Sequence, residues 1–260
     1  MEETAAGSVE EAPQMNFFQR LTGIFFEPTK TFADISRKRS WFGMFLLICI
    51  VTIGVTYLLQ YRMDPADMAV KSLAMSKPIM KKFMGPEQLA QLEEQAVKQA
   101  SQPRSFFAKY SPIVTTPLAM YITYLVLAAI FLLVFLMTGA GITFRKAFTA
   151  AIWGMGPPAI VVTLLSVLFI FVKNPADLEI IPAYNVVSNL GMLVDANVHP
   201  AMNSLFSSID LFSLWTIILL AIGFAAMSEK KLTPGKAATP IVVLWLIWVL
   251  LKMGFWAILG

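Results

Sequence analysis

The chain has 260 residues, of which 57% are apolar and 14% are charged, and its formal net charge is +4. Ordinary soluble domains contain roughly 45–50% apolar and about 25% charged residues, so this composition favours a membrane protein. No dense basic run interleaved with aromatic residues is present, which argues against a nucleic-acid partner. The positive charge instead favours contact with the anionic leaflet of a lipid bilayer.

The first residues of the chain are acidic and small. Met1 to Gln14 has no basic start leading into an apolar stretch, so a cleaved signal peptide is not expected. Residues 1–15 are predicted to form a disordered acidic tail.

Residues 16–40 are predicted to form an amphipathic segment made of two short helical pieces. Asn16 is suited to cap the first piece, Pro28 separates the two, and apolar residues recur at helical spacing in both. Each piece has about ten residues and is too short to cross a bilayer. The segment is therefore expected in the membrane interface or, as the alternative, packed under the bundle. The candidate membrane-surface residues are Phe17, Phe18, Phe25, Phe26, Arg37, Lys38 and Arg39.

Residues 41–260 are predicted to form the membrane domain. A helix needs roughly 17–25 mostly apolar residues to cross a hydrocarbon core of about 30 Å. Five stretches approach this requirement: 41–60, 113–137, 147–172, 209–227 and 241–259. The predicted fold is an all-α integral membrane protein, a five-transmembrane-helix bundle with an N-terminal interfacial helix and a helical extramembrane loop.

Two longer connections separate these stretches. The 61–112 loop is rich in good helix formers around 86–100, and an earlier piece, 65–83, also has a helical pattern. The loop is expected to be a helical excursion outside the bilayer, with its docking on the bundle left open. The 173–208 connection is punctuated by Asn and Pro, and 201–206 is expected to be a short helix leading into the fourth span.

Basic residues in short loops predict the orientation. Arg145, Lys146, Lys230, Lys231 and Lys236 lie in 138–146 and 228–240, whereas 173–208 contains only one basic residue. The N-terminus and these two loops are therefore predicted to be cytoplasmic, and the C-terminus to lie outside.

Asp210 and Lys252 are the two charged residues placed within predicted spans. Asp210 is expected either to cap the fourth helix or to face a cavity or a partner, because a carboxylate at membrane depth is costly. Lys252 either snorkels to the interface or pairs with Asp210. Both are candidate functional residues.

The third predicted span is interrupted by Gly154-Met-Gly156-Pro157-Pro158, which is expected to kink the helix. Such a kink either lines a site or is only part of the bundle architecture, so the four named residues are also candidates. Catalytic motifs are missing from the sequence: His199 is the only histidine and Cys49 the only cysteine. No metal, cofactor or enzymatic activity is therefore predicted.

Several short motifs resemble those of the Yip family, the Ypt/Rab-interacting five-helix membrane proteins. They are Phe25-Phe-Glu-Pro-Thr-Lys-Thr-Phe32 before the first span, Phe144-Arg-Lys146 before the third, and Asp210-Leu-Phe-Ser-Leu-Trp215 entering the fourth. The resemblance is to bacterial members, covers about residues 17–259 and implies a bacterial inner membrane as the location. The eukaryotic branch binds small GTPases in vesicle trafficking, so the resemblance implies an adaptor. The long 61–112 insertion departs from that branch.

The predicted function is a non-enzymatic membrane scaffold or adaptor for partner proteins or for membrane organisation. The alternative is a small transporter or lipid-handling component with its site near the kinked third span and Asp210. The expected partners are the lipid bilayer and an unidentified membrane or cytoplasmic protein, and homo-oligomerisation is left open.

Overall fold

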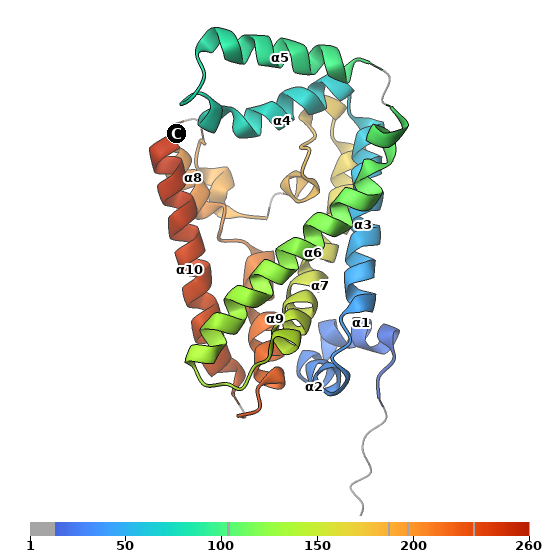
Figure 1. Cartoon of the computed structure of the whole chain (residues 1–260), viewed down its shortest axis with the longest axis vertical. Helices are drawn as coiled ribbons and strands as arrows, with labels where there is room; N and C mark the ends of the chain where they lie inside the picture. Colours follow the sequence, from blue (N-terminus) through green and yellow to red (C-terminus); the bar gives the residue numbers. More distant parts are fainter. Residues whose placement is uncertain (1–13, 103–104, 187, 197, 231, 260) are drawn as a thin grey trace, which may run out of the picture.

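The computed structural model describes residues 14–102, 105–186, 188–196, 198–230 and 232–259. The described part of the chain contains ten α-helices, three short 3₁₀ helices and one isolated β-bridge, between Asn189 and Asp210. The predicted acidic tail falls mostly outside the described residues. The helices form an elongated bundle with smaller helices across both of its ends (Figure 1).

Four described helices are long and apolar enough to cross a membrane. They are α3 (Phe42–Arg62), α6 (Phe106–Met137), α7 (Phe144–Val172) and α10 (Pro234–Leu259). The predicted first and third spans match α3 and α7 closely. Helices α6 and α10 begin about seven residues before the stretches predicted from apolarity, because their first turns contain polar and proline residues.

The predicted fourth span differs from the other four in length. It corresponds to α9 (Leu211–Met227), an apolar helix of 17 residues. At 1.5 Å per residue this helix is about 26 Å long, slightly less than the hydrocarbon thickness of about 30 Å. The structure therefore gives four helices of full spanning length and one shorter apolar helix.

Helix α7 is the centre of the bundle. It packs against α9, α3 and α6, and its residues from Lys146 to Trp153 are buried. The main hydrophobic cluster surrounds this half of the helix and includes a stacked pair of rings, Phe135 of α6 and Phe224 of α9, whose centroids are 4.3 Å apart. The other helices are therefore arranged around α7.

At one end of the bundle lie α4 (Pro65–Met80) and α5 (Pro86–Ala100), at the positions where the 61–112 loop is predicted to be helical. Lys77 of α4 and Glu93 of α5 form an ion pair of 2.6 Å. Lys71 Nζ donates hydrogen bonds to the carbonyl oxygens of Ala176 and Leu178, at 2.8 and 2.6 Å. The hairpin is therefore docked on the bundle through the segment that follows α7.

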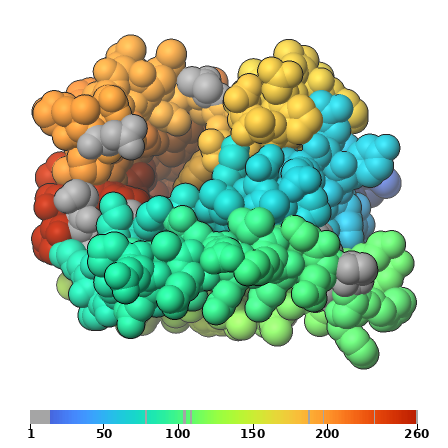
Figure 2. All heavy atoms as spheres, turned by 90° about the horizontal axis from the view of Figure 1, so that it is seen from above, coloured from blue at the N-terminus to red at the C-terminus, as the bar shows by residue number. Residues whose placement is uncertain are grey.

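The segment between α7 and α9 folds against the same end. It contains η1 (Pro175–Asp177), η2 (Pro182–Asn185), η3 (Leu190–Leu193) and α8 (Pro200–Phe206), which agrees with the short helix predicted at 201–206. Asparagine side chains form hydrogen bonds with the backbone of this irregular segment. Asn185 accepts from the Glu179 N–H and donates to the Glu179 carbonyl oxygen, and Asn203 donates to the carbonyl oxygens of Gly191 and Val194. Figure 2 views this end and shows the segment, in yellow and orange, beside α4 and α5.

Candidate functional site at the N-terminal helices

The opposite end of the bundle carries α1 (Phe17–Phe26) and α2 (Pro28–Lys38). Asn16 and Gln19 form a capping box at the start of α1: the Asn16 side chain accepts from the Gln19 N–H at 2.9 Å, and the Gln19 side chain accepts from the Asn16 N–H at 2.8 Å. Pro28 begins α2, a position that proline favours because its missing N–H is not needed there. The two helices are thus separately defined by local sequence.

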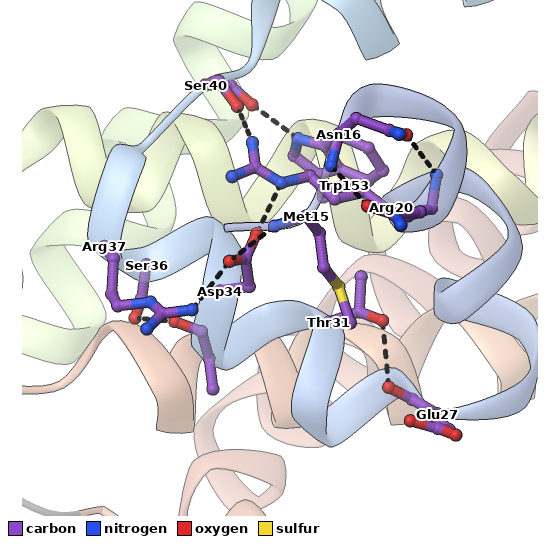
Figure 3. Close-up of polar contacts among 12 residues, drawn as sticks. Met15, Asn16, Arg20, Glu27, Thr31, Asp34, Ser36, Arg37, Ser40 and Trp153 are labelled. Carbon is purple, nitrogen blue, oxygen red and sulfur yellow. Dashed lines mark hydrogen bonds and ion pairs between the residues drawn. The ribbon is translucent and has the colours of Figure 1, made fainter. Parts of the chain in front are cut away.

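A buried ion pair joins the two helices (Figure 3). Arg20 Nε of α1 lies 2.7 Å from Asp34 Oδ2 of α2, and both side chains are at most 5% exposed. Asp34 Oδ1 also accepts from Arg37 Nη2 at 2.8 Å and from the Met15 N–H at 3.2 Å. Burial alone would raise the pKa of Asp34, but the hydrogen bonds from Met15, Arg20 and Arg37 outweigh it and hold that pKa below its usual value.

The same network fixes the helices to the bundle. Arg20 donates to the Ser40 hydroxyl, and the Trp153 Nε1–H of α7 donates to the Ser40 carbonyl oxygen at 2.7 Å. On the apolar side, Phe32 is fully buried, and a Cβ added at Gly223 of α9 would lie only 2.8 Å from its ring. Two placements were predicted for residues 16–40, in the membrane interface or packed under the bundle. The inner face of this segment packs against the bundle.

The candidate membrane-surface residues fall into two groups. Phe17 is partly buried beside Trp153, with ring centroids 6.2 Å apart, and Phe25 lies 5.5 Å from the Trp215 ring. Phe18 and Phe26 are 74% and 84% exposed. The outward surface beside Phe26 is hollowed by a depression of about 610 Å³, lined partly by Gln19, Thr22 and Lys30. We call this surface, with Phe18, the outer face of α1.

The basic candidates also differ from one another. Arg37 is tied to Asp34, Lys38 is exposed, and Arg39 ends α2 in a left-handed conformation with φ of 50°. They belong to a strongly basic end of the bundle that has nine described basic residues and three acidic ones. The nine are Arg20, Lys30, Arg37, Lys38, Arg39, Arg145, Lys146, Lys230 and Lys236. At the other end, the described residues of 62–109 and 173–195 contain eight basic and eight acidic residues.

Asp210 is the N-cap of α9. Its Oδ1 accepts from the N–H groups of Phe212 and Ser213 at 2.8 and 3.1 Å, and its Oδ2 accepts from the Ser213 hydroxyl. Lys252 lies on α10, half-buried, and forms no ion pair with Asp210 within 4.0 Å. Both carboxylate oxygens of Asp210 are thus used by the cap.

We expect Asp210→Ala to lower the free energy of unfolding by about 1 kcal/mol, within the range of 0.5–2 kcal/mol found for lost helix caps. Asp210→Asn keeps a capping oxygen and should stay close to the wild type. The measurement is thermal unfolding in detergent. Equal losses in the two variants would contradict capping as the role of this side chain, and a loss in Lys252→Met as large as that in Asp210→Ala would favour pairing.

The two candidate glycines of α7 are points of close helix packing. A Cβ at Gly154 would lie 2.7 Å from Leu220 Cδ2 and 3.2 Å from Leu220 Cα, and a Cβ at Gly156 would lie 2.8 Å from Ile48 Cδ1. Helix α7 continues from Phe144 to Val172 through Pro157 and Pro158, which are both buried. The four residues therefore sit within the packed core of the bundle.

The described residues do not form a candidate metal site. No group of three or more His, Cys, Asp or Glu side chains able to hold a metal ion is found among them. Cys49 is buried, and His199 precedes Pro200 at the start of α8.

Two polar pairs were missed by the sequence analysis. Asp34 carries the network that holds α1 on α2, and Lys146 Nζ lies 2.8 Å from Glu229 Oε1, joining α7 to the connection after α9. The partners are 14 and 83 residues apart in sequence. No local pattern links such pairs, because the two partners of each pair lie on different elements.

An all-α bundle with four long apolar helices and a charge asymmetry between its ends is a multi-pass integral membrane protein. The Yip1 domain model matches residues 22–256, which is most of the chain, so the protein belongs to the Yip1 domain family. The resemblance predicted from the short motifs is confirmed, while the bacterial branch stays a prediction. No significant match to a curated protein or to a solved structure was found.

Proposed function

We propose that this protein is a non-enzymatic membrane scaffold that presents its α1–α2 unit to a protein partner. The observation that carries the proposal is the contrast between the two faces of this unit. Its inner face is fixed by the buried Arg20–Asp34 pair and by Phe32, whereas its outer face exposes Phe18 and Phe26 beside polar side chains. Two helices that are fixed to the bundle and expose aromatic side chains are suited to binding a protein, because they lose little conformational entropy on association.

The proposal includes five membrane crossings with a cytoplasmic N-terminus. Support comes from the chain path: the connections after α6 and α9 lie at the same end as α1 and α2, while α4, α5 and the last residues of α10 lie at the other (Figure 1). The short connections at the first end, 138–146 and 228–240, contain more basic residues than 173–208 at the other end, which agrees with the positive-inside rule for short loops. Helix α9 is then a short span whose outer end is covered by α8 and the 173–208 segment.

The transport alternative receives less support. A transport site would need groups that are available to a substrate, and the Asp210 oxygens are occupied by the cap of α9. The central turns of α7 around Gly154 and Gly156 are in close contact with α9 and α3. Scaffolding therefore remains the function that the geometry favours.

The test is affinity capture of partners in mild detergent with the double variant Phe18→Ser/Phe26→Ser. A deletion of residues 16–40 is unsuitable, since it would also remove the buried core residues Ile24, Phe32 and Ile35. The matched control is Phe83→Ser/Phe107→Ser, two equally exposed rings at the opposite end.

We expect the first double variant to lose its partners by roughly tenfold or more, as exposed aromatic anchors at interfaces commonly contribute 2 kcal/mol or more. The control should capture the wild-type set. The adaptor role of this face fails if both double variants, folded and equally abundant, capture the same partners as the wild type.

A further inference from the structure

A second surface at the basic end lies where three connections meet. The end of α2, the α6–α7 loop and the α9–α10 loop all lie at this end of the bundle (Figure 1), and residues from each of the first two act on Glu229 in the third. Lys146 Nζ lies 2.8 Å from the Glu229 carboxylate, and the charge of Arg39 acts on the same group. Lys230 Nζ reaches the loop at Gly139, 3.4 Å from where a Cβ on that glycine would lie. We call these residues the Glu229 junction.

The junction is held in a fixed shape by backbone contacts. Ala140 O accepts from the Ser228 hydroxyl at 2.8 Å and from the Glu229 N–H at 3.2 Å. Gly139 and Gly141 both have φ of +66°, a conformation that side chains disfavour, and a Cβ at Gly141 would lie 3.0 Å from Glu229 Cβ. The two loops are therefore held against each other by these hydrogen bonds.

The charges of the junction are not balanced. Glu229 is the one acidic residue of the junction, beside the three basic residues Lys146, Arg39 and Lys230. The hydrogen bond and charge of Lys146, and then the charge of Arg39, hold the pKa of Glu229 below its usual value, so this carboxylate is ionised at neutral pH. Arg39 Nε is buried and has no hydrogen-bond partner. Since Glu229 is paired with Lys146, the charges of Arg39 and Lys230 are in excess, and an external anion would balance them.

Arg39 also occupies a position that its backbone does not favour. It is the only described residue other than glycine with positive φ. Glycine is the usual residue in this conformation at a helix end, since any Cβ there is strained. A basic side chain at such a position indicates that its charge, and not its backbone preference, suits the site.

We propose that the Glu229 junction binds the phosphate-bearing headgroup of an anionic phospholipid in the adjacent leaflet. The excess cations match a phosphate, for which arginine and lysine are the common ligands. Two apolar side chains flank the same loop, Met137 at the end of α6 and Phe144 at the start of α7, and they are 89% and 41% exposed. A lipid satisfies both features at once, whereas a soluble phosphate would leave the apolar side chains uncovered.

The test is native mass spectrometry of the full-length protein in detergent, incubated with equal amounts of phosphatidylglycerol and phosphatidylcholine of the same chain length. We expect preferential retention of phosphatidylglycerol. The double variant Arg39→Gly/Lys230→Gln should lose this preference by roughly tenfold or more, because each basic residue at an anionic surface contributes about a fivefold effect. Lys81→Gln/Lys98→Gln, the same charge change at the opposite end, should retain it.

Two further variants separate binding from folding. Arg39→Gly alone should unfold at the wild-type temperature or higher, because glycine relieves the left-handed strain, and yet bind less phosphatidylglycerol. Glu229→Gln should unfold earlier in phosphatidylcholine, since Lys146 loses its partner, and recover in phosphatidylglycerol. If these residues only stabilised the fold, Arg39→Gly would not lose lipid while keeping its unfolding temperature, and Glu229→Gln would not recover its stability in phosphatidylglycerol.

The proposal is overturned if the phosphatidylglycerol preference persists in Arg39→Gly/Lys230→Gln, or if the control pair lowers it equally. It is also overturned if millimolar inorganic phosphate alone displaces the lipid completely, since the ligand would then be soluble phosphate. No residue of the junction belongs to the outer face of α1. Failure here would therefore leave the partner-binding test at Phe18 and Phe26 unaffected.

Discussion

Asp34→Ala is expected to lower the free energy of unfolding by about 3–5 kcal/mol, the usual cost of removing one partner from a buried ion pair. The loss is large because Arg20, whose Nη2 already has no hydrogen-bond partner, would be left as an uncompensated buried charge. Unfolding can be followed with a thiol-reactive dye, because Cys49 is the only cysteine of the chain and is buried.

The control for this variant is Glu94→Ala, which breaks an exposed pair with Lys98. Exposed pairs of this kind contribute little to stability, because water and salt screen their charges. The double variant Arg20→Met/Asp34→Leu removes both charges and should recover much of the lost stability. An Asp34→Ala protein as stable as Glu94→Ala would show that the network does not hold α1 and α2 in place.

The same network sets a pH dependence. The pKa of Asp34 lies below its ordinary value of 3.8, so the folded state binds its proton more weakly than the unfolded state does. The stability contributed by Asp34 is therefore fully present above pH 3.8 and is lost as the pH falls through the lowered pKa. In Asp34→Asn this part of the acid destabilisation should be absent.

Gly154→Val is expected to destabilise the bundle by about 2–3 kcal/mol. The added side chain would meet both the side chain and the Cα atom of Leu220, and the backbone of α9 cannot move away without disturbing its contacts with α7 and α2. Gly54→Val is the control on α3, since no atom lies within 4 Å of a Cβ at that position. Its unfolding temperature should remain close to that of the wild type.

A compensating change tests the same contact from the other side. Leu220→Ala removes the atoms nearest to Gly154, so Gly154→Ala should cost less in that background than in the wild type. If the two changes are additive, the close approach of α7 and α9 is not what makes this glycine necessary.

Apolar periodicity along the chain was sufficient to place the long helices. The boundaries of α3, α7 and α5 were predicted to within three residues, because a helix that faces lipid or solvent is encoded by its own composition. The lengths of α6 and α10 were underestimated, since their first turns are polar and contain proline. The boundaries of α9 were predicted to within two residues, and the cap at Asp210 leaves this helix 17 residues long.

The candidate sites were predicted less well than the helices. The sequence identified Asp210, Gly154 and Gly156 as unusual, but only the structure shows that one is a cap and the others are packing positions. Asp34 and Glu229 were not singled out, because an acidic residue in a polar segment has no distinctive local pattern. Their partners come from other helices, and such long-range pairing is decided by tertiary packing.

By itself, then, the sequence determined that this is a multi-span helical membrane protein, since hydrocarbon thickness and backbone hydrogen bonding restrict long apolar stretches to helices. Its short motifs also indicated the Yip1 family, which the domain match confirms. Tertiary structure alone decided that α1 and α2 are mounted on the bundle and that two distant loops converge on Glu229. The physical reason is that ion pairs and close glycine contacts depend on which helices become neighbours, and helix composition does not specify neighbours.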